Sequence, residues 1–199
     1  MLRPMERIDG NGGRYRNAPA PEPTDEALMC SIAADDPRGL ELLMDRHWVP
    51  LMRFVVRSLD GWDEAEDVVQ DVFVRVWRAR TSWQADGSIR AYLHRIARNL
   101  VIDAGRHRRV REKGGDLPLR RRRTPTPAEE AIRGELQEDL ERALSGLAPR
   151  RREAFVLVRL QGMTLKEAGD VMELTPRTVA NHVYLAATDL AEALSAHLS

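Results

Sequence analysis

The sequence predicts an all-α protein of two small helical domains joined by a flexible basic linker. Apolar residues recur every three or four positions along most of the chain, which is the period of a helix rather than a strand. Gly- and Pro-rich segments interrupt this pattern, and a composition of 43% hydrophobic and 31% charged residues among 199 allows cores of modest size. We expect four segments: a leader over 1–23, a first domain over 24–111, a linker over 112–126 and a second domain over 127–199.

The leader contains Gly, Pro and Arg without any helical period, so we expect it to be disordered. It lacks the apolar segment of a signal peptide. No stretch of the chain reaches the roughly 18 consecutive apolar residues of a membrane helix, so we expect a cytoplasmic protein with no membrane insertion. The single cysteine, Cys30, cannot form an intrachain disulfide.

The first two helices of the first domain are indicated by the residues at their starts. Thr24 is a suitable N-cap, and Asp25 and Glu26 place acids in the first turn. Pro37 suits the first position of a longer helix that carries a broad apolar stripe. Pro50 lies inside this stripe, where we expect it to kink the helix.

The next segment, 63–80, is predicted to be a helix although 72–77 is rich in strand-forming residues. Its valines and aromatics fall on one helical stripe, and its polar residues fall on the opposite one. Residues 60–71 contain six Asp and Glu and no Lys or Arg. The polar side is either solvated or a docking face for a partner. The positions of this acidic stripe are Glu66, Asp67, Gln70 and Asp71.

The fourth helix begins after a loop, with Ser88 as its N-cap, and has a basic outer face. Residues 90–123 hold twelve Lys and Arg against three acids. Arginines repeated along one face can neutralise successive phosphates of a nucleic acid, although a solvated basic face is an equally ordinary arrangement. The outer positions of this basic face are Arg95, Arg98, Asn99, Arg106 and Arg109.

A change of composition separates the two domains. Gly, Pro and Arg dominate 112–126, which cannot build a core and so predicts a linker. A capping box at Thr126 opens a helix of the second domain. Pro149 opens the next helix.

The end of the chain predicts a helix-turn-helix. Thr164 and Glu167 form a capping box for a short helix, and Pro176 opens a final, longer one. Between them lies a turn at 173–174. Two helices in this arrangement form a DNA-binding unit whose second helix enters the major groove.

Enzymatic chemistry is not indicated by the sequence. There is no phosphate-binding glycine loop, no nucleophile elbow, and no pair of His or Cys at the spacing of a metal site. The acidic stripe lacks an accompanying histidine and a second acidic helix to face it. We therefore expect no catalysis, no cofactor and no bound metal.

Two groups of motifs resemble the two domains of extracytoplasmic-function sigma factors. DEAEDVVQDVFVRVW at 63–77 and RAYLHRIARNLVID at 90–103 resemble their region-two domain. Their region-four domain is similar to LAPRRREAF at 147–155, GMTLKE at 162–167 and TPRTV at 175–179. The resemblance implies a protein that binds core RNA polymerase, directs promoter-specific transcription initiation and assists DNA melting.

The resemblance also implies a partner for each face. The acidic stripe would dock on the clamp helices of the largest polymerase subunit. The basic face would read the promoter minus-ten element, while the loop 81–88 helps to capture an unstacked base at a cost of a few kcal/mol. The minus-35 element would be read by Arg177, Thr178, Asn181 and His182, with Arg150 and Arg151 holding phosphates.

Several positions depart from the usual pattern of that family. Ala180, His182 and Leu185 stand where basic residues are common, so we expect weaker phosphate anchoring. Glu173 stands in the turn where glycine is common, and we expect strain there. At Ala168-Gly169 the family has larger side chains, which predicts thin packing.

Two other classes of protein are compatible with parts of this sequence. An autonomous helix-turn-helix regulator would bind operator DNA without polymerase, because 178–183 also resembles response-regulator helices. The acidic stripe argues against this reading. A protein-binding helical adaptor would leave the basic face without a role. Members of the sigma family are often held by an anti-sigma factor, which is therefore an expected partner.

Overall fold

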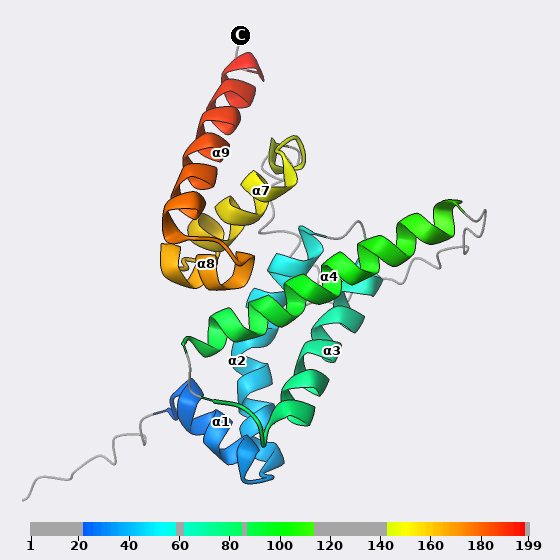
Figure 1. Cartoon of the computed structure of the whole chain (residues 1–199), viewed down its shortest axis with the longest axis vertical. Helices are drawn as coiled ribbons and strands as arrows, with labels where there is room; N and C mark the ends of the chain where they lie inside the picture. Colours follow the sequence, from blue (N-terminus) through cyan, green and yellow to red (C-terminus); the bar gives the residue numbers. More distant parts are fainter. Residues whose placement is uncertain (1–21, 59–61, 85–86, 114–142, 198–199) are drawn as a thin grey trace, which may run out of the picture.

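The computed structural model describes residues 22–58, 62–84, 87–113 and 143–197. These residues form helices with no strand among them (Figure 1). Most of the predicted leader and linker lies outside the described residues, as does the helix predicted after Thr126 except for its end, where 143–145 are helical. The helices are α1 (Asp25–Ala33), α2 (Pro37–Val56), α3 (Trp62–Ala79), α4 (Ile89–Lys113), α7 (Pro149–Phe155), the π-helical η1 (Val156–Leu160), α8 (Leu165–Met172) and α9 (Pro176–His197).

The first domain consists of α1 to α4, and its boundaries follow the predicted signals. The Thr24 hydroxyl accepts a hydrogen bond from the backbone N–H of Ala27, at 3.2 Å. Pro37 is the first residue of α2, which continues past Pro50 to Val56. The helical prediction for 63–80 is confirmed by α3. At the other end of the domain, α4 extends two residues into the predicted linker.

Valines of α3 form the centre of the first domain. Val69, Val72 and Val76 are fully buried, as the helical stripe predicted. Trp48 of α2 stacks on Phe73 with ring centroids 6.3 Å apart. Burying branched and aromatic side chains on one side of α3 leaves its polar residues on the outward side, which positions the acidic stripe.

The second domain holds the predicted helix-turn-helix. The capping box of α8 is complete: the Thr164 hydroxyl accepts from the Glu167 backbone N–H at 3.1 Å, and a Glu167 carboxylate oxygen accepts from the Thr164 N–H at 2.9 Å. The helix that begins at Pro149 is α-helical only to Phe155, and then widens into η1. Because α8 packs on both η1 and α9, it holds the final helix in place.

The turn between α8 and α9 is strained, as predicted. Glu173 adopts the left-handed conformation, with φ 57° and ψ 45°. The backbone of the turn also passes close to Gly169, where an added Cβ would lie 2.7 Å from the carbonyl oxygen of Leu174. The expectation of thin packing at Gly169 was therefore wrong, because the turn itself fills the space of the missing side chain.

Replacing Glu173 with glycine should stabilise the second domain. A non-glycine residue in the left-handed region costs about 1 kcal/mol, and glycine removes this cost apart from a smaller entropic penalty. We expect Glu173→Gly to raise the free energy of unfolding by about 0.5–1 kcal/mol, measured by denaturant titration. A fall in stability would show that the Glu173 side chain contributes more than its backbone strain costs.

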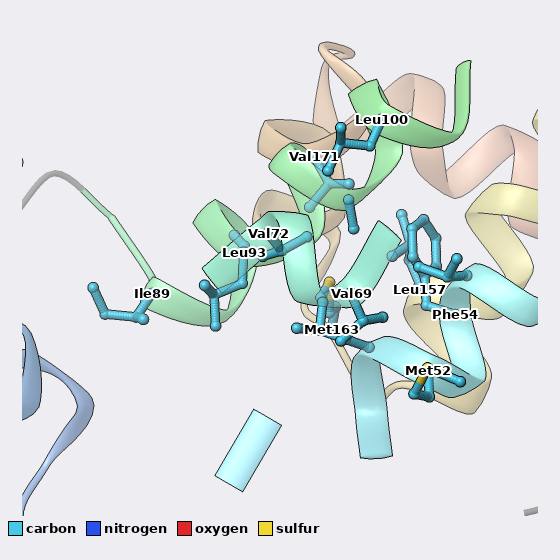
Figure 2. Packing of buried hydrophobic residues seen from close by; sticks show 14 of the residues in the cluster. Met52, Phe54, Val69, Val72, Ile89, Leu93, Leu100, Leu157, Met163 and Val171 are labelled. Atoms are coloured by element: carbon cyan, nitrogen blue, oxygen red, sulfur yellow. The ribbon is translucent and has the colours of Figure 1, made fainter. Parts of the chain in front are cut away.

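The two domains share a hydrophobic core, which the sequence did not predict, and the second domain also has a smaller buried cluster around Leu147 and Leu190. Leu157, Met163 and Val171 of the second domain belong to the same buried cluster as Phe54 and Leu93 of the first. Figure 2 shows Met163 and Leu157 close to Val69 and Phe54. The principal contact between the domains is α8 packed on α4. The second domain therefore lies directly on the helix that bears the basic face (Figure 1).

Candidate polymerase and nucleic-acid interfaces

The acidic stripe lies on the outward side of α3. Asp67, Gln70 and Asp71 are exposed, and Glu66 is half-buried. Gln70 Nε2 donates to Glu66 Oε1 at 3.4 Å. The structure thus brings the four predicted residues together on one continuous surface.

An open groove borders the acidic stripe between α3 and α4. The stripe forms one wall, and Leu100 and Asp103 of α4 form the other. Val74, 41% exposed, adds an apolar side chain to the same groove. Arg75 also lines the groove, but the groove's carboxylates at Asp67, Asp71 and Asp103 outnumber this one cation. A mainly acidic rim around apolar side chains suits a protein partner that presents basic and apolar residues.

The basic face predicted on α4 is divided between two sides of the helix. Arg95, Asn99 and Arg106 are exposed. Arg98 instead points into the contact with the second domain, where its side chain is only 8% exposed. The side chain of Arg109 lies outside the described residues. Three of the five predicted residues therefore share an accessible surface in this arrangement.

A pocket of about 320 Å³ lies where the loop before α4 meets the start of that helix. Trp83 and Ser88 contribute from the loop, and Tyr92 and Arg95 contribute from α4. The Arg95 guanidinium lies 5.9 Å from the centre of the Tyr92 ring. Burial raises the pKa of Tyr92 above 10.0 despite the opposing charge of Arg95, so its hydroxyl remains a hydrogen-bond donor at neutral pH. An aromatic ring, a guanidinium and hydroxyls together can stack on and hydrogen-bond to a planar polar ring.

The exposed stripe of α9 differs in part from the predicted reading residues. Arg177 and Asn181 are exposed, as expected for a base-reading surface. Thr178 and His182 are half-buried, and the Thr178 hydroxyl lies 2.8 Å from that of Thr175. Tyr184, 70% exposed, continues the line of Arg177 and Asn181 at helical spacing.

Arg150 and Arg151, the predicted phosphate contacts, both have carboxylate neighbours. Arg150 is exposed and lies 3.6 Å from Glu153. Arg151 Nη1 donates to both carboxylate oxygens of Asp189 on α9, at 2.6 and 2.9 Å. Arg151 therefore connects α7 to α9, and a DNA phosphate that binds Arg151 would compete with the Asp189 carboxylate.

Among the described residues, the side chains of Arg98, Arg90 and Gln161 each make polar contacts with the other domain. Arg98 Nε donates to Glu153 Oε1 at 2.5 Å. Arg90 Nη2 donates to Glu167 Oε2 at 3.0 Å, and its guanidinium also donates to two backbone carbonyl oxygens at the end of η1. Gln161 Nε2 donates to the carbonyl oxygen of Pro50, at 3.1 Å. We call these three contacts the interdomain latch.

Glu167 is held ionised at its place in the latch. Burial raises the pKa of its carboxyl, but hydrogen bonds from Thr164 and Ser88 and the charge of Arg90 together lower the pKa to about 2. The contact with Arg90 is therefore an ion pair throughout the physiological pH range.

Neither a metal centre nor a membrane span is found in the part of the chain that the structure describes. No group of three or more His, Cys, Asp or Glu is placed there to hold a metal ion. No helix within the same residues is long and apolar enough to cross a bilayer.

Comparison with known proteins identifies the family. Residues 43–111 match the Sigma-70 region 2 family, and residues 137–190 match the Sigma-70, region 4 family. RNA polymerase sigma factor CnrH of Cupriavidus metallidurans is 33% identical over 88% of this chain and 97% of its own length. ECF RNA polymerase sigma factor SigE of Mycolicibacterium smegmatis is 31% identical, over 89% of this chain and 72% of that relative. This chain belongs to the ECF sigma factors.

Solved structures of sigma factors share the fold. CnrH in complex with the cytosolic domain of CnrY aligns with a TM-score of 0.68 at 29% identity, covering 86% of this chain and 97% of that one. The sigma factor RpoE in complex with the anti-sigma factor NepR from Bartonella quintana aligns with a TM-score of 0.60 at 26% identity, covering 81% and 97%. As a sigma factor, this chain binds core RNA polymerase and directs promoter-specific transcription initiation, which the findings favour over an autonomous regulator.

Sequence reasoning missed two features of this sigma factor. Tyr184 was overlooked because an aromatic residue on a helix is usually part of the core, although its spacing from Arg177 and Asn181 was a usable signal. The latch was missed because its partners are remote in sequence: Arg90 and Glu167 are 77 residues apart.

Proposed function

We propose that the acidic stripe and the adjoining groove are the surface with which this sigma factor docks on core RNA polymerase. The stripe combines exposed carboxylates with apolar side chains at the groove, and it lies away from the contact between the two domains. Exposed carboxylates beside apolar side chains are the main support for a docking surface here. Basic residues on the polymerase would pair with Asp67 and Asp71, and Gln70 would add a hydrogen bond.

We propose further that promoter DNA is read at two separate places. The outer face of α4 and the pocket beside Trp83 would take the minus-ten element and an unstacked base, which the Tyr92 ring could hold. The minus-35 element would lie along Arg177, Asn181 and Tyr184 of α9 in the major groove. A tyrosine offers a hydroxyl to a base edge and a ring to a thymine methyl group.

An anti-sigma factor is the further partner that we propose. The solved structure with NepR is described as a complex with an anti-sigma factor, and that of CnrH contains the cytosolic domain of CnrY. Each solved sigma-factor chain aligns with this one over 97% of its own length. We also propose that the protein performs no covalent chemistry of its own and acts in the cytoplasm, beside the polymerase.

Removing the polar groups of the acidic stripe should weaken polymerase binding. We expect the Gln70→Ala, Asp71→Ala double variant to bind core polymerase about fivefold more weakly, because rim charges and hydrogen bonds of an interface contribute about 1 kcal/mol together. Size-exclusion co-elution and fluorescence titration with purified core polymerase measure this loss.

A matched control removes two acids from another helix of the same domain. Glu41 and Asp45 are exposed on α2, one turn apart, away from the groove. The Glu41→Ala, Asp45→Ala variant should bind core polymerase like the wild type. Equal affinities of the two double variants would remove the acidic stripe from the docking surface.

A further inference from the structure

A pocket of about 170 Å³ lies at the junction of the two domains. It is lined by the end of α2, the middle of α4, α7 and the first residue of η1. Ser58 lines this pocket and is exposed, so solvent reaches it. Of the lining residues, Arg98 alone belongs to the predicted DNA-reading set, and its side chain faces inward. We call this site the junction pocket; the proposed polymerase contact and promoter contacts do not use it.

Most of the wall of the junction pocket is apolar. Phe54 and Val156 are each 2% exposed, and Val101 is half-buried. A cavity of about 150 Å³ with side chains of this kind around it holds a benzene molecule. The junction pocket therefore has room for one ring or for a branched chain of similar size. An inorganic ion would instead lose its hydration against this wall without compensation.

The charged side chains that line the junction pocket are mainly basic. They are three arginines and one glutamate, namely Arg57, Arg98, Arg152 and Glu153. Arg98 Nε donates to Glu153 Oε1 at 2.5 Å, and Arg150 Nη1 lies 3.6 Å from the other oxygen of the same carboxylate. The one carboxylate of the pocket is therefore already paired with two cations, and the lining side chains keep a net positive charge.

Arg152 is the lining cation whose charge is left for a ligand. Its Nη2 donates to the backbone carbonyl oxygens of Ser145 and Leu147, at 2.5 and 3.3 Å. These oxygens accept hydrogen bonds without cancelling the positive charge, and no carboxylate in the described part of the chain pairs with Arg152. Its Nε is buried with no acceptor among the same residues. A buried donor without an acceptor is unfavourable, which favours a ligand that brings an oxygen to this guanidinium.

We propose that the junction pocket is a binding site for a small monocarboxylate with a compact apolar body, such as a single six-membered ring. A carboxylate matches the planar donor group of an arginine and forms short, charge-assisted hydrogen bonds with it. The carboxylate pairs with Arg152, and the apolar body packs against Phe54, Val101 and Val156. A single negative charge suits the pocket better than a dianion, because Glu153 also lines it.

Benzoate is the probe that tests this site, because it combines one ring with one carboxylate. The full chain is titrated with sodium benzoate at constant ionic strength in an isothermal calorimeter. We expect a dissociation constant of about 1 mM or lower, which is an ordinary affinity for a ligand of this size. The unfolded chain has no such pocket, so about 10 mM benzoate should raise the midpoint temperature of unfolding by about 4 °C.

Two further compounds separate the contributions of the carboxylate and of the ring. Benzyl alcohol keeps the ring and lacks the charge, so it should bind at least about tenfold more weakly than benzoate. Inorganic phosphate keeps negative charge and lacks the apolar body, so it should not displace benzoate at equal ionic strength.

Two pairs of variants place the ligand in the pocket. Arg152→Gln removes the pairing charge and should weaken benzoate binding at least about tenfold. Its matched control is Arg159→Gln, at an exposed position of η1 outside the pocket lining, which should bind benzoate like the wild type.

Ser58 supplies the second pair, which carries the test if Arg152→Gln does not fold by circular dichroism. Ser58→Trp places a large ring at the exposed edge of the pocket and should abolish benzoate binding. Ser58→Ala loses only the hydrogen bond from the Ser58 hydroxyl to the carbonyl oxygen of Phe54, and should leave the affinity unchanged.

Absence of both a binding heat and a temperature shift with benzoate would overturn the proposal. Equal affinities of the folded Arg152→Gln and Arg159→Gln variants, or of Ser58→Trp and Ser58→Ala, would place the ligand elsewhere and would also overturn it. Benzyl alcohol binding as tightly as benzoate, or displacement of benzoate by phosphate, would refute the recognition of an apolar carboxylate. These titrations need neither polymerase nor promoter DNA, so their result is separate from that of the co-elution experiment.

Discussion

Acidification from pH 6.5 towards pH 4 should destabilise the folded chain by about 3 kcal/mol through His94 alone. His94 is fully buried, and burial is the main cause that lowers its pKa from 6.5 to about 4. Its Nδ1–H donates to the carbonyl oxygen of Arg90 at 2.9 Å. Its Nε2 is buried with no hydrogen-bond partner among the described residues. Protonation would therefore place a charge on an atom that has no acceptor.

The direction of this pH effect follows from the protonation of His94 in the folded and in the unfolded chain. Above pH 6.5 His94 is neutral in both the folded and the unfolded chain, and its contribution to stability is complete. Between pH 6.5 and pH 4 the unfolded chain binds a proton that the folded chain excludes, so the free energy of unfolding falls with pH. The hydrogen bond to the Arg90 carbonyl and the charge of Glu167 raise the pKa of His94, and the charges of His47 and Arg90 lower it, but burial has the largest effect.

Denaturant titrations at several pH values measure this effect. Carboxylates also titrate in the acid range, so the His94→Leu variant serves as the control, since it retains every other group. The free energy of unfolding of the wild type should fall about 3 kcal/mol further than that of His94→Leu between pH 7 and pH 4. Parallel pH profiles for the two proteins would contradict the assignment.

Gly169→Ala should be the second severe change, with a loss of about 2 kcal/mol in the free energy of unfolding. An alanine Cβ would meet the carbonyl oxygen of Leu174 at 2.7 Å, and that oxygen belongs to backbone and not to a movable side chain. Either the helix-turn-helix turn shifts or α8 and α9 separate slightly. Binding of the minus-35 element should weaken together with stability, because α8 positions α9.

Gly105→Ala serves as a control, because this substitution should raise the free energy of unfolding instead of lowering it. It lies inside α4, and a Cβ added there meets no atom within 4 Å. Gly105→Ala should therefore stabilise the chain by about 0.5–1 kcal/mol through helix propensity. If Gly169→Ala were also stabilising in the same denaturant titration, the close approach of the turn would be excluded.

Local features of the structure followed from the sequence because their causes are local. Thr24 and the pair Thr164 and Glu167 cap helices through hydrogen bonds that span only three residues. The spacing of the valines in α3 predicted a helix and not a strand, and the structure confirms this prediction. The acidic stripe was predictable for the same reason, since the buried side of α3 decides which side faces outward. The left-handed conformation of Glu173 was expected from the resemblance, because the family commonly has glycine in this turn.

The sequence alone determined the helices, their caps, the acidic stripe and the family to which this sigma factor belongs. The tertiary structure alone decided that Arg98 faces Glu153 and that Tyr184 stands exposed on α9. Helical periodicity separates polar from apolar sides of a helix, but a polar side can face water or a complementary charge of another domain. That choice depends on contacts such as the one between Arg90 and Glu167, whose partners meet only when the whole chain has folded.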